Sequence, residues 1–239
     1  MIKKLILGSG TFYKEGLNLK EQRDILMTLD IDGVELCVAK TEEMDEIQAD
    51  NEHILFLQRY DYNVVHAPFK KGYLITKSNK EEEFRKLITL AKKVKAHHIV
   101  FHLYNVKSIE ILSDFPFPFT IENTLTGDWN GNKIIQIMKS NPNCVMTLDT
   151  SHAFHFGDEE FALLTNNLRN QIKHVHLSNI IDEVHHRQFI HDNKGEKKLK
   201  EIMDKLPEEI LITVEENFTN NKDIEKELKL IRMVMANGK

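Results

Sequence analysis

The sequence contains little cysteine: of its 239 residues, only Cys37 and Cys144 are cysteines. Each lies in an apolar run and neither belongs to a C-x-x-C pair, so we expect two reduced, packed thiols in an intracellular protein rather than a structural disulfide. Long hydrophobic runs are missing as well. Residues 1–16 hold too few apolar positions for the core of a signal peptide, and no later stretch has the length of a membrane span. We therefore expect a cytoplasmic protein without a membrane partner.

An excess of basic residues is also missing. The formal net charge is −5 and the pI is near 6.2, whereas proteins that bind nucleic acid usually carry a basic excess or a basic stripe. This composition argues against a nucleic-acid partner but does not exclude one. No Pro-, Ser- or Gly-rich linker marks a boundary, and an apolar content of 41% is enough for a substantial core. We expect one domain that spans residues 1–239.

The chain does have eight short apolar runs of the kind that form buried strands, which start 20 to 40 residues apart: 4–9, 33–38, 63–68, 98–103, 119–124, 144–149, 172–177 and 210–216. Segments with helical periodicity and charged faces separate them, such as 79–96 and 223–237. The segment 105–118 leaves room for only a short helix. The sequence therefore predicts a strand followed by a helix, eight times over.

Apolar strands that alternate with amphipathic helices are typical of a parallel sheet covered by helices. Eight such units in 239 residues fit an α/β fold of one kind, a single (β/α)8 TIM barrel, whose usual size is about 250 residues. A doubly wound open sheet is the alternative. It fits less well because residues 8–16, after the first candidate strand, lack the G-x-G-x-x-G spacing of a phosphate-binding turn.

Six of the eight candidate strands end in a residue that can bind a metal ion. In a TIM barrel the carboxyl ends of the strands meet at one rim, where active sites lie. An unpaired buried carboxylate or imidazole there costs several kcal/mol or shifts its pKa, and a divalent cation would satisfy several of them at once. The alternative is that a neighbour's hydrogen bond satisfies each one separately. The six residues are His66, His102, Glu122, Asp149, His176 and Glu215.

The loops that follow these strands add further candidates. His152 and His191 follow the sixth and seventh candidate strands and are positioned to bind the substrate or an additional metal ion. Arg187 and Lys194 can pair with a phosphate or carboxylate of a substrate. Phe69 and Trp129 can stack on a sugar ring or simply pack, while Glu35 lines the pocket or bonds to the backbone.

For other residues near the rim, the sequence gives weaker evidence of a role in the site. His174 shares the inward parity of His176 and is expected to support the site or the core. His185 and His186 lie in a loop that passes over the barrel, where solvated side chains are the usual case. Only one of Glu215 and Glu216 can face inward if the strand alternates, and the sequence leaves open which. No pattern singles out His53, His97, His98 or His155.

Short motifs in the strands and their loops, namely "VVHAPF", "VFHL", "TIENT", "LDTSH", "HVHLSN" and "ITVEEN", occur in an order that resembles the xylose-isomerase-like TIM-barrel superfamily over essentially the whole chain. This superfamily includes the sugar isomerases and epimerases and endonuclease IV, an apurinic endonuclease of family 2. The resemblance implies a metal-dependent enzyme with the TIM-barrel fold, and it identifies the branch only weakly.

The resemblance implies different ligand sets in the two branches. In the epimerase branch, one Mn²⁺ or similar ion is held by four residues, which match Glu122, Asp149, His176 and Glu215. In the endonuclease branch, two further zinc ions are bound. The first matches His66 and His102 with a shared Glu122, and the second matches His152 with an Asp-x-His pair. His191 is present, but Phe189 occupies the position of the expected Asp. We therefore expect one to two divalent ions per chain, Zn²⁺ or Mn²⁺, with Mg²⁺ or Co²⁺ as further candidates.

Three functions follow from these observations. The preferred one is a metal-dependent isomerase or epimerase of a sugar or sugar phosphate, with Glu122 and Glu215 as the catalytic acid and base next to a carbonyl. The second is an endonuclease IV-like phosphodiesterase. His66 and His102 favour this reading, whereas the acidic charge and the lack of Arg-rich early loops oppose it, since only Lys70 and Lys71 follow "HAPF". The third is a ligand-binding barrel without catalysis. The sequence leaves the substrate and the oligomeric state open.

Overall fold

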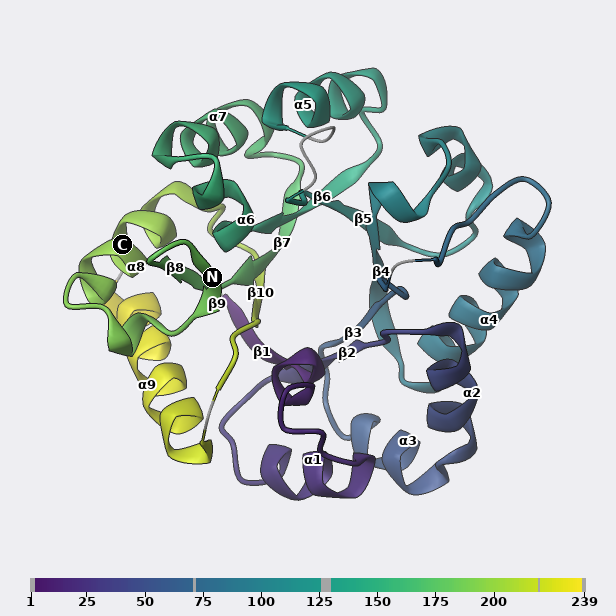
Figure 1. Cartoon of the computed structure of the whole chain (residues 1–239), viewed down its shortest axis with the longest axis horizontal. Helices are drawn as coiled ribbons and strands as arrows, with labels where there is room; N and C mark the ends of the chain where they lie inside the picture. The colour runs from purple at the N-terminus through teal and green to yellow at the C-terminus, as the bar shows by residue number, and fades with distance from the viewer. Residues whose placement is uncertain (1–2, 71, 126–129, 219, 238–239) are drawn as a thin grey trace.

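Eight parallel strands close into a barrel in the computed structural model, which describes residues 3–70, 72–125, 130–218 and 220–237 (Figure 1). Around the barrel the strands follow the order β1-β10-β7-β6-β5-β4-β3-β2, so neighbours in sequence are neighbours in space. The strands of the barrel are β1 Lys4–Gly8, β2 Gly33–Cys37, β3 Asn63–His66, β4 Ala96–His102, β5 Phe119–Glu122, β6 Val145–Asp149, β7 Ile172–Leu177 and β10 Leu211–Val214. Each of the eight candidate strands is found, and the prediction of an α/β fold with a single (β/α)8 TIM barrel is confirmed.

Helices form a ring outside the barrel (Figure 1). The α-helices are α1 Leu19–Leu26, α2 Thr41–Ala49, α3 Asn51–Leu57, α4 Lys80–Lys93, α5 Gly131–Ser140, α6 Thr150–His155, α7 Asp158–Leu168, α8 Gly195–Lys205 and α9 Asn221–Asn237. Short 3-10 helices are η1 Ser9–Phe12, η2 Leu103–Asn105, η3 Ile109–Asp114 and η5 Phe189–His191. Within the described ranges, no helix combines the length and the apolar character that crossing a membrane requires.

Two segments depart from a regular strand–helix alternation: the compact segment 105–118, as the sequence predicts, and the loop after β7. The segment after β4 contains only the 3-10 helices η2 and η3 in place of an α-helix, because Pro116 and Pro118 close it before a longer helix can form. The loop over the barrel after β7 forms a hairpin of β8 Asn179–Ile181 and β9 Val184–Arg187. This hairpin packs against α6 and brings side chains of the loop to the rim.

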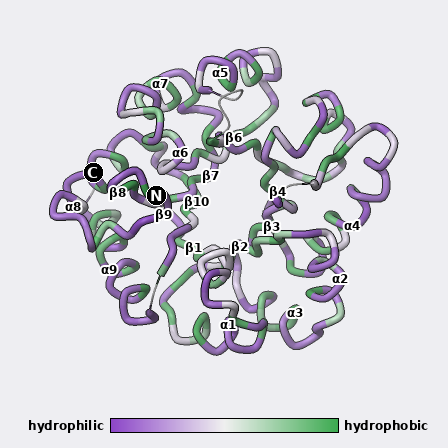
Figure 2. Tube along the Cα trace, viewed as in Figure 1, coloured by the Kyte–Doolittle hydropathy of each residue, from purple (hydrophilic) through white to green (hydrophobic). Residues whose placement is uncertain are grey.

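The apolar side chains form a large core between the strands and the helices and a much smaller cluster apart from it. Leu5 and Leu7 of β1 belong to the large core, while Ile6 packs with Val64 and Val100 in the small cluster. Because successive residues of a strand point to opposite sides, the small cluster lies inside the barrel. Hydrophobic positions recur along the strands and on the helix faces turned toward them (Figure 2).

Close packing of the strands depends on one glycine. Gly33 begins β2, and a Cβ atom at this position would collide with the backbone carbonyl of Tyr62, which precedes β3. The neighbouring strands therefore approach at a distance that only glycine allows. The register that follows pairs Cys37 with His66, so the carboxyl ends of β2 and β3 meet at the same rim.

Candidate active site

The six polar strand ends converge at one rim of the barrel. His66, His102, Glu122 and Asp149 are the last residues of β3, β4, β5 and β6. His176 is the last residue but one of β7 and is paired in register with Asp149, while Glu215 directly follows β10. Parallel pairing in this register places all six side chains at the carboxyl end of the barrel, where the sequence predicts them. The structure brings the whole set together.

Four of these residues form a group that can hold a metal ion. Glu122, Asp149, His176 and Glu215 each offer one ligand atom, and these atoms all lie within 4.8 Å of one another. Ligand atoms bound to one cation at bond lengths of about 2.0–2.2 Å must lie at most about 4.4 Å apart, so only a small contraction separates this group from a closed coordination shell. Three carboxylates and one imidazole are a donor set that suits Mn²⁺ or Zn²⁺.

Two atoms in this group support the assignment, because they are buried and make no hydrogen bond. Nδ1 of His176 lies 2.9 Å from Oε2 of Glu215, yet neither this contact nor any other in the described structure gives it a hydrogen bond. Oδ2 of Asp149 is also buried without a hydrogen-bond partner among the described residues. Buried polar atoms are normally satisfied, so two unsatisfied atoms in one group of donors fit a site that binds a cation.

The other atoms of Asp149 and His176 are held by hydrogen bonds. Oδ1 of Asp149 accepts from the hydroxyl of Ser151 at 3.0 Å and from the backbone N–H of His152 at 2.7 Å. Nε2 of His176 donates to Oε1 of Glu35 at 3.0 Å. Each side chain is thus fixed through one atom and leaves the other toward the rim, which is how ligands of protein-bound metals are commonly oriented.

Glu122 lies between the four-residue group and two histidines. Its Oε2 is 3.0 Å from Nε2 of His66 and 2.8 Å from Nε2 of His102. Burial opposes its negative charge, but His102 and His176 outweigh burial and hold the pKa of Glu122 well below its usual range. Burial likewise opposes charge on His66, whose pKa is nevertheless raised by Glu122, while burial lowers the pKa of His102. One carboxylate thus serves both histidines and the metal-binding group.

His152 and His186 form a second group with Asp149, again with ligand atoms within 4.8 Å of one another. Nδ1 of His152 donates to the carbonyl of Asn123 and Nδ1 of His186 to the carbonyl of Glu215, both at 3.0 Å. In its neutral form, a ring whose Nδ1–H is bound in this way presents the lone pair of Nε2 to an ion. Burial opposes charge on His152, but Asp149 and Glu122 outweigh it and raise the pKa of His152 to about 9.

His186 is a site residue to which sequence analysis gave little weight. Its φ of 55° lies in the left-handed region, which is uncommon for any residue but glycine, and the β8–β9 hairpin has an irregular register. Such irregularities often redirect a side chain beside an active site. His186 is half-buried and lines the cavity. Its only sequence signal was a position in a loop over the barrel, because a backbone twist leaves no pattern in the residue types.

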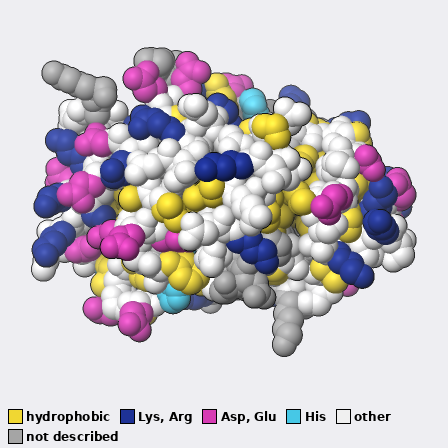
Figure 3. All heavy atoms as spheres, turned by 90° about the horizontal axis from the view of Figure 1, so that it is seen from above, with side chains coloured by type: hydrophobic (Ala, Val, Ile, Leu, Met, Phe, Trp, Pro, Cys, Tyr) yellow, Lys and Arg dark blue, Asp and Glu magenta, His cyan; other side chains and the backbone are white. Residues whose placement is uncertain are grey.

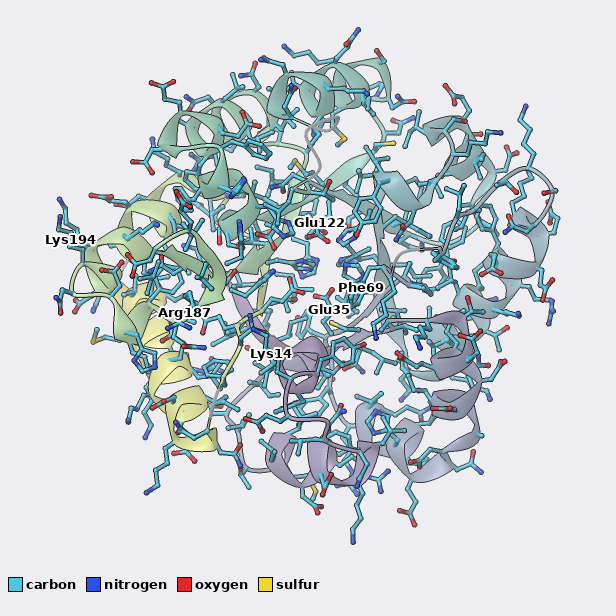
Figure 4. All side chains as sticks on the ribbon, in the orientation of Figure 1. Lys14, Glu35, Phe69, Glu122, Arg187 and Lys194 are labelled. Carbon is cyan, nitrogen blue, oxygen red and sulfur yellow. The ribbon has the colours of Figure 1, made fainter. Side chains whose placement is uncertain are left out.

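A cavity of about 280 Å³ opens above these groups. Phe69, Tyr104 and Leu125 provide apolar surface, and the remaining lining is polar. No lysine or arginine is among the described residues that line it, which are His66, Phe69, His102, Tyr104, Glu122, Thr124, Leu125, His152, His186 and Glu215. Figure 4 shows Phe69 and Glu122 directed toward the middle of the barrel. Trp129, the other aromatic candidate, lies outside the described residues.

Three residues of the sequence-based selection lie away from this cavity. Nε2 of His191 is 3.6 Å from Oδ2 of Asp223, and its side chain is 42% exposed. Lys194 precedes α8 and lies at the outer edge of the molecule, where it lines a separate cavity between α7 and α8 (Figure 4). Arg187 ends β9 outside the cavity lining. The structure does not bring these three residues to the metal-binding group.

Of the two neighbouring glutamates after β10, Glu215 faces the cavity and Glu216 does not. Glu215 lines the cavity, whereas Glu216 is 1% exposed and turned toward Glu227 of α9. Glu35 neither lines the cavity nor bonds to the backbone through its side chain: it binds His176 and the hydroxyl of Thr213. His174 is fully buried below the rim, as expected for a supporting residue.

Comparison with solved structures shows the same fold in other proteins. A D-tagatose 3-epimerase-like protein is 19% identical with a TM-score of 0.68, covering 98% of this chain and 99% of that one. A xylose isomerase domain protein from Alicyclobacillus acidocaldarius is 12% identical with a TM-score of 0.69, over 98% and 99% of the two chains. D-psicose 3-epimerase from Clostridium cellulolyticum, solved with D-tagatose, is 13% identical with a TM-score of 0.67, over 97% and 99%.

These likenesses confirm, at the level of the fold, the resemblance to xylose-isomerase-like barrels that the motifs indicate. Neither a family model nor a curated protein matches the sequence. At identities of 12 to 19%, a shared barrel carries no activity by itself, since one fold hosts many functions.

Proposed function

We propose that the chain is a divalent-metal-dependent sugar isomerase or epimerase that moves a proton next to a carbonyl group. The observation that carries the proposal is the group of Glu122, Asp149, His176 and Glu215, in which two buried atoms lack hydrogen bonds among the described residues. The names of two similar structures, a D-tagatose 3-epimerase-like protein and a D-psicose 3-epimerase, point to the same kind of reaction.

A divalent cation bound by this group would neutralise the carboxylates and polarise the carbonyl oxygen of the substrate. Glu215 is the carboxylate that we assign as the base. Its side chain is 24% exposed and lines the cavity, whereas that of Glu122 is 1% exposed. Burial opposes the charge on Glu215, but His176 outweighs it and lowers the pKa, so Glu215 is ionised and able to accept a proton.

Glu122 is the residue that we assign to deliver the second proton. Its own pKa is held low, so that proton would be held on the ring of His66, whose Nε2 lies 3.0 Å from Oε2 of Glu122 and whose pKa, despite burial, this carboxylate raises. Epimerisation requires a proton to leave one face of a carbon atom and another to arrive on the opposite face, and we assign these two transfers to Glu215 and Glu122, which both line the cavity. His152 and His186 line the cavity and are placed to orient substrate hydroxyls.

The cavity lining also indicates the type of sugar. Phe69, Tyr104 and Leu125 can pack against the carbon face of a sugar, while the polar groups bind hydroxyls. A phosphate group normally meets Arg or Lys, and neither type is present among the described lining residues. This composition favours an unphosphorylated sugar over a sugar phosphate.

A proton-exchange experiment tests the proposed reaction. The protein is loaded with Mn²⁺ or Zn²⁺ and incubated in D₂O with a panel of ketoses and ketose phosphates, and deuterium uptake next to the carbonyl is followed by NMR. We expect uptake into at least one unphosphorylated ketose, its loss after treatment with a chelator, and its return when the metal is added back. Absence of exchange across the panel at high protein concentration contradicts the proposal.

One observation favours a second candidate, a metal-dependent phosphodiesterase. His66 and His102 converge on the same oxygen of Glu122, at 3.0 and 2.8 Å, and resemble the ligands of an additional zinc ion. The formal net charge of −5 gives it little support, and on the flank of the molecule drawn in Figure 3 Lys and Arg side chains are interspersed with Asp and Glu. Metal analysis separates the two candidates, since an epimerase needs one ion per chain and the phosphodiesterase two or more. In addition, only the phosphodiesterase should cleave an abasic-site oligonucleotide.

A further inference from the structure

Inside the barrel, a column of polar side chains lies below the metal-binding group. The residues of this column are fully buried: Glu35, Thr147, His174 and Thr213 are 0% exposed, and Thr120 is 1% exposed. The interior of a TIM barrel is usually filled by Val, Ile and Leu, as it is in this barrel at Ile6, Val64 and Val100. Burying a polar group costs free energy unless it is hydrogen-bonded, so the polar atoms of this column need hydrogen-bond partners.

The column contains a continuous chain of hydrogen bonds that ends at Glu35. Nε2 of His98 lies 3.1 Å from Nδ1 of His174, and Nε2 of His174 lies 2.6 Å from Oγ1 of Thr213. The Thr213 hydroxyl donates to Oε2 of Glu35 at 2.5 Å, and Nε2 of His176 lies 3.0 Å from Oε1 of Glu35. The chain thus connects the half-buried His98 with a ligand of the proposed cation.

The positions of the protons in this chain follow from the carboxylate. A carboxylate only accepts, so both Thr213 and His176 donate to Glu35. Because Thr213 has a single proton and uses it there, its oxygen accepts from Nε2–H of His174. Nδ1 of His174 is then an acceptor for His98. The ring of His174 thus has one donor and one acceptor nitrogen, as in a neutral imidazole.

The consequence for His176 is a fixed orientation. With Nε2–H bound to Glu35, its Nδ1 faces Oε2 of Glu215 at 2.9 Å and Oε1 of Glu122 at 3.5 Å. We propose that Glu35 is a positioning residue, which together with Thr213 and His174 holds the ring of His176 so that Nδ1 binds the cation. This inference rests on the proposed function, because it assumes the cation at the rim. Partners of this kind raise the basicity of a ligating histidine, and their loss typically weakens metal binding about 10- to 100-fold.

Four variants test the inference, with the metal alone as the probe. Glu35→Gln keeps the size of the side chain and removes its charge. Thr213→Val removes the hydroxyl between His174 and Glu35, and Thr213→Ser restores it. Thr120→Val is the matched control, because Thr120 lies on a side branch: it bonds to Thr147 at 2.6 Å, and Thr147 meets Nδ1 of His174 at 3.1 Å, so the bonds from His174 through Thr213 to Glu35 stay in place. Zn²⁺ affinity is measured by competition with a chelator, and melting temperatures show that each variant folds.

We expect Glu35→Gln and Thr213→Val to weaken Zn²⁺ binding about 10- to 100-fold, and Thr213→Ser and Thr120→Val to bind within about threefold of the wild type. Unchanged affinity in Glu35→Gln overturns the inference. NMR of protein with ¹⁵N-labelled histidine gives a readout that a merely structural role does not move. In the zinc-loaded wild type the proton of His176 is expected on Nε2, and its resonance is expected to shift in Glu35→Gln but not in Thr120→Val. A proton on Nδ1, with zinc on Nε2, also overturns the inference.

The same NMR experiment separates this inference from the proposed function. If the wild type binds no divalent cation, the proposed function fails. The bond from His176 to Glu35 is then examined in the cation-free protein, where the Nε2 proton of His176 is expected to be protected from exchange in the wild type and to lose that protection in Glu35→Gln. Equal protection in both proteins overturns the positioning role.

Discussion

Glu215 and Glu216 follow β10 as neighbours in the chain, and their carboxyl groups have opposite surroundings. Glu215 lines the cavity beside His176, which outweighs burial and lowers its pKa. Glu216 is buried behind the rim, where burial and Glu227 raise its pKa well above the usual range. The first environment favours a carboxylate and the second a neutral acid. Buried acids of one type thus differ in charge according to which side of the strand end they occupy.

Two buried histidines show the same contrast. His176 is in contact with Glu35, Glu122 and Glu215, which outweigh burial and raise its pKa well above the usual range. His53 of α3 is also almost fully buried, but neither ring nitrogen has a hydrogen-bond partner among the described residues, and burial lowers its pKa to about 4. The charged form is therefore favoured for His176 and Glu215 at the rim, and the neutral form for Glu216 and His53 behind it.

The largest effect is expected from replacing, one at a time, the two glutamates that directly follow β10. Glu215→Gln removes the proposed base, and we expect deuterium exchange into the substrate to fall about 10²- to 10⁴-fold. Glu216→Gln replaces an acid that favours its neutral form with a neutral amide of the same shape, and we expect exchange within a few-fold of the wild type. NMR in D₂O measures both. Equal losses in the two variants contradict the contrast.

The buried histidine of α3 should make stability depend on pH. Between pH 6.5 and about 4 the unfolded chain protonates His53 and the folded protein does not, so stability falls as the solution is acidified through this range. A shift from 6.5 to about 4 corresponds to about 3 kcal/mol at the acid end.

We therefore expect His53→Leu to lose less stability than the wild type between pH 7 and pH 4.5, as measured by urea denaturation. His97→Gln is the control, because His97 is an exposed histidine of the same chain. Parallel pH profiles for the wild type and His53→Leu exclude the explanation by burial.

A smaller effect is expected at Glu227, which anchors η5. Its two carboxylate oxygens accept from the backbone N–H groups of Phe189 and Ile190 at 2.9 and 3.0 Å. Glu227→Gln offers only one acceptor and places an N–H group against another, so we expect a loss of about 1–3 kcal/mol in the free energy of unfolding. Glu225→Gln, on the exposed side of the same helix, should be neutral. Equal stability of the two variants would show that the anchor contributes nothing.

The smallest effects are expected at two residues that the sequence places in the site and the structure places outside the cavity. His191→Ala removes only a half-exposed contact with Asp223 at 3.6 Å, and Lys194→Ala changes the outer edge of the molecule. We expect each to change stability by at most about 0.5 kcal/mol and to leave metal affinity unchanged. His152→Ala is the comparison variant: His152 lines the cavity, so its loss should change the metal affinity at the rim. Loss of metal in His191→Ala would contradict this expectation, because it would mean that an ion binds at His191, away from the metal-binding group.

The sequence by itself determines the barrel and the inner ring of donors. Buried parallel strands leave an apolar signal that is hard to mistake, and a polar residue at the end of such a strand stands out against it. For this reason His66, Glu122 and Asp149 could be identified from their positions alone. The rim on which they meet follows from the parallel order of the strands, which the alternation of strand and helix already specifies.

Only the tertiary structure decides the residues that act on this ring from other parts of the chain. Glu35 is 141 residues from His176, and no local pattern records the bond between them. His186 reaches the cavity through a left-handed backbone, and Glu215 is distinguished from Glu216 only where β10 ends. Periodicity records which face of an element is buried, but the partner that a buried polar atom meets depends on contacts between distant segments, which exist only once the barrel has closed.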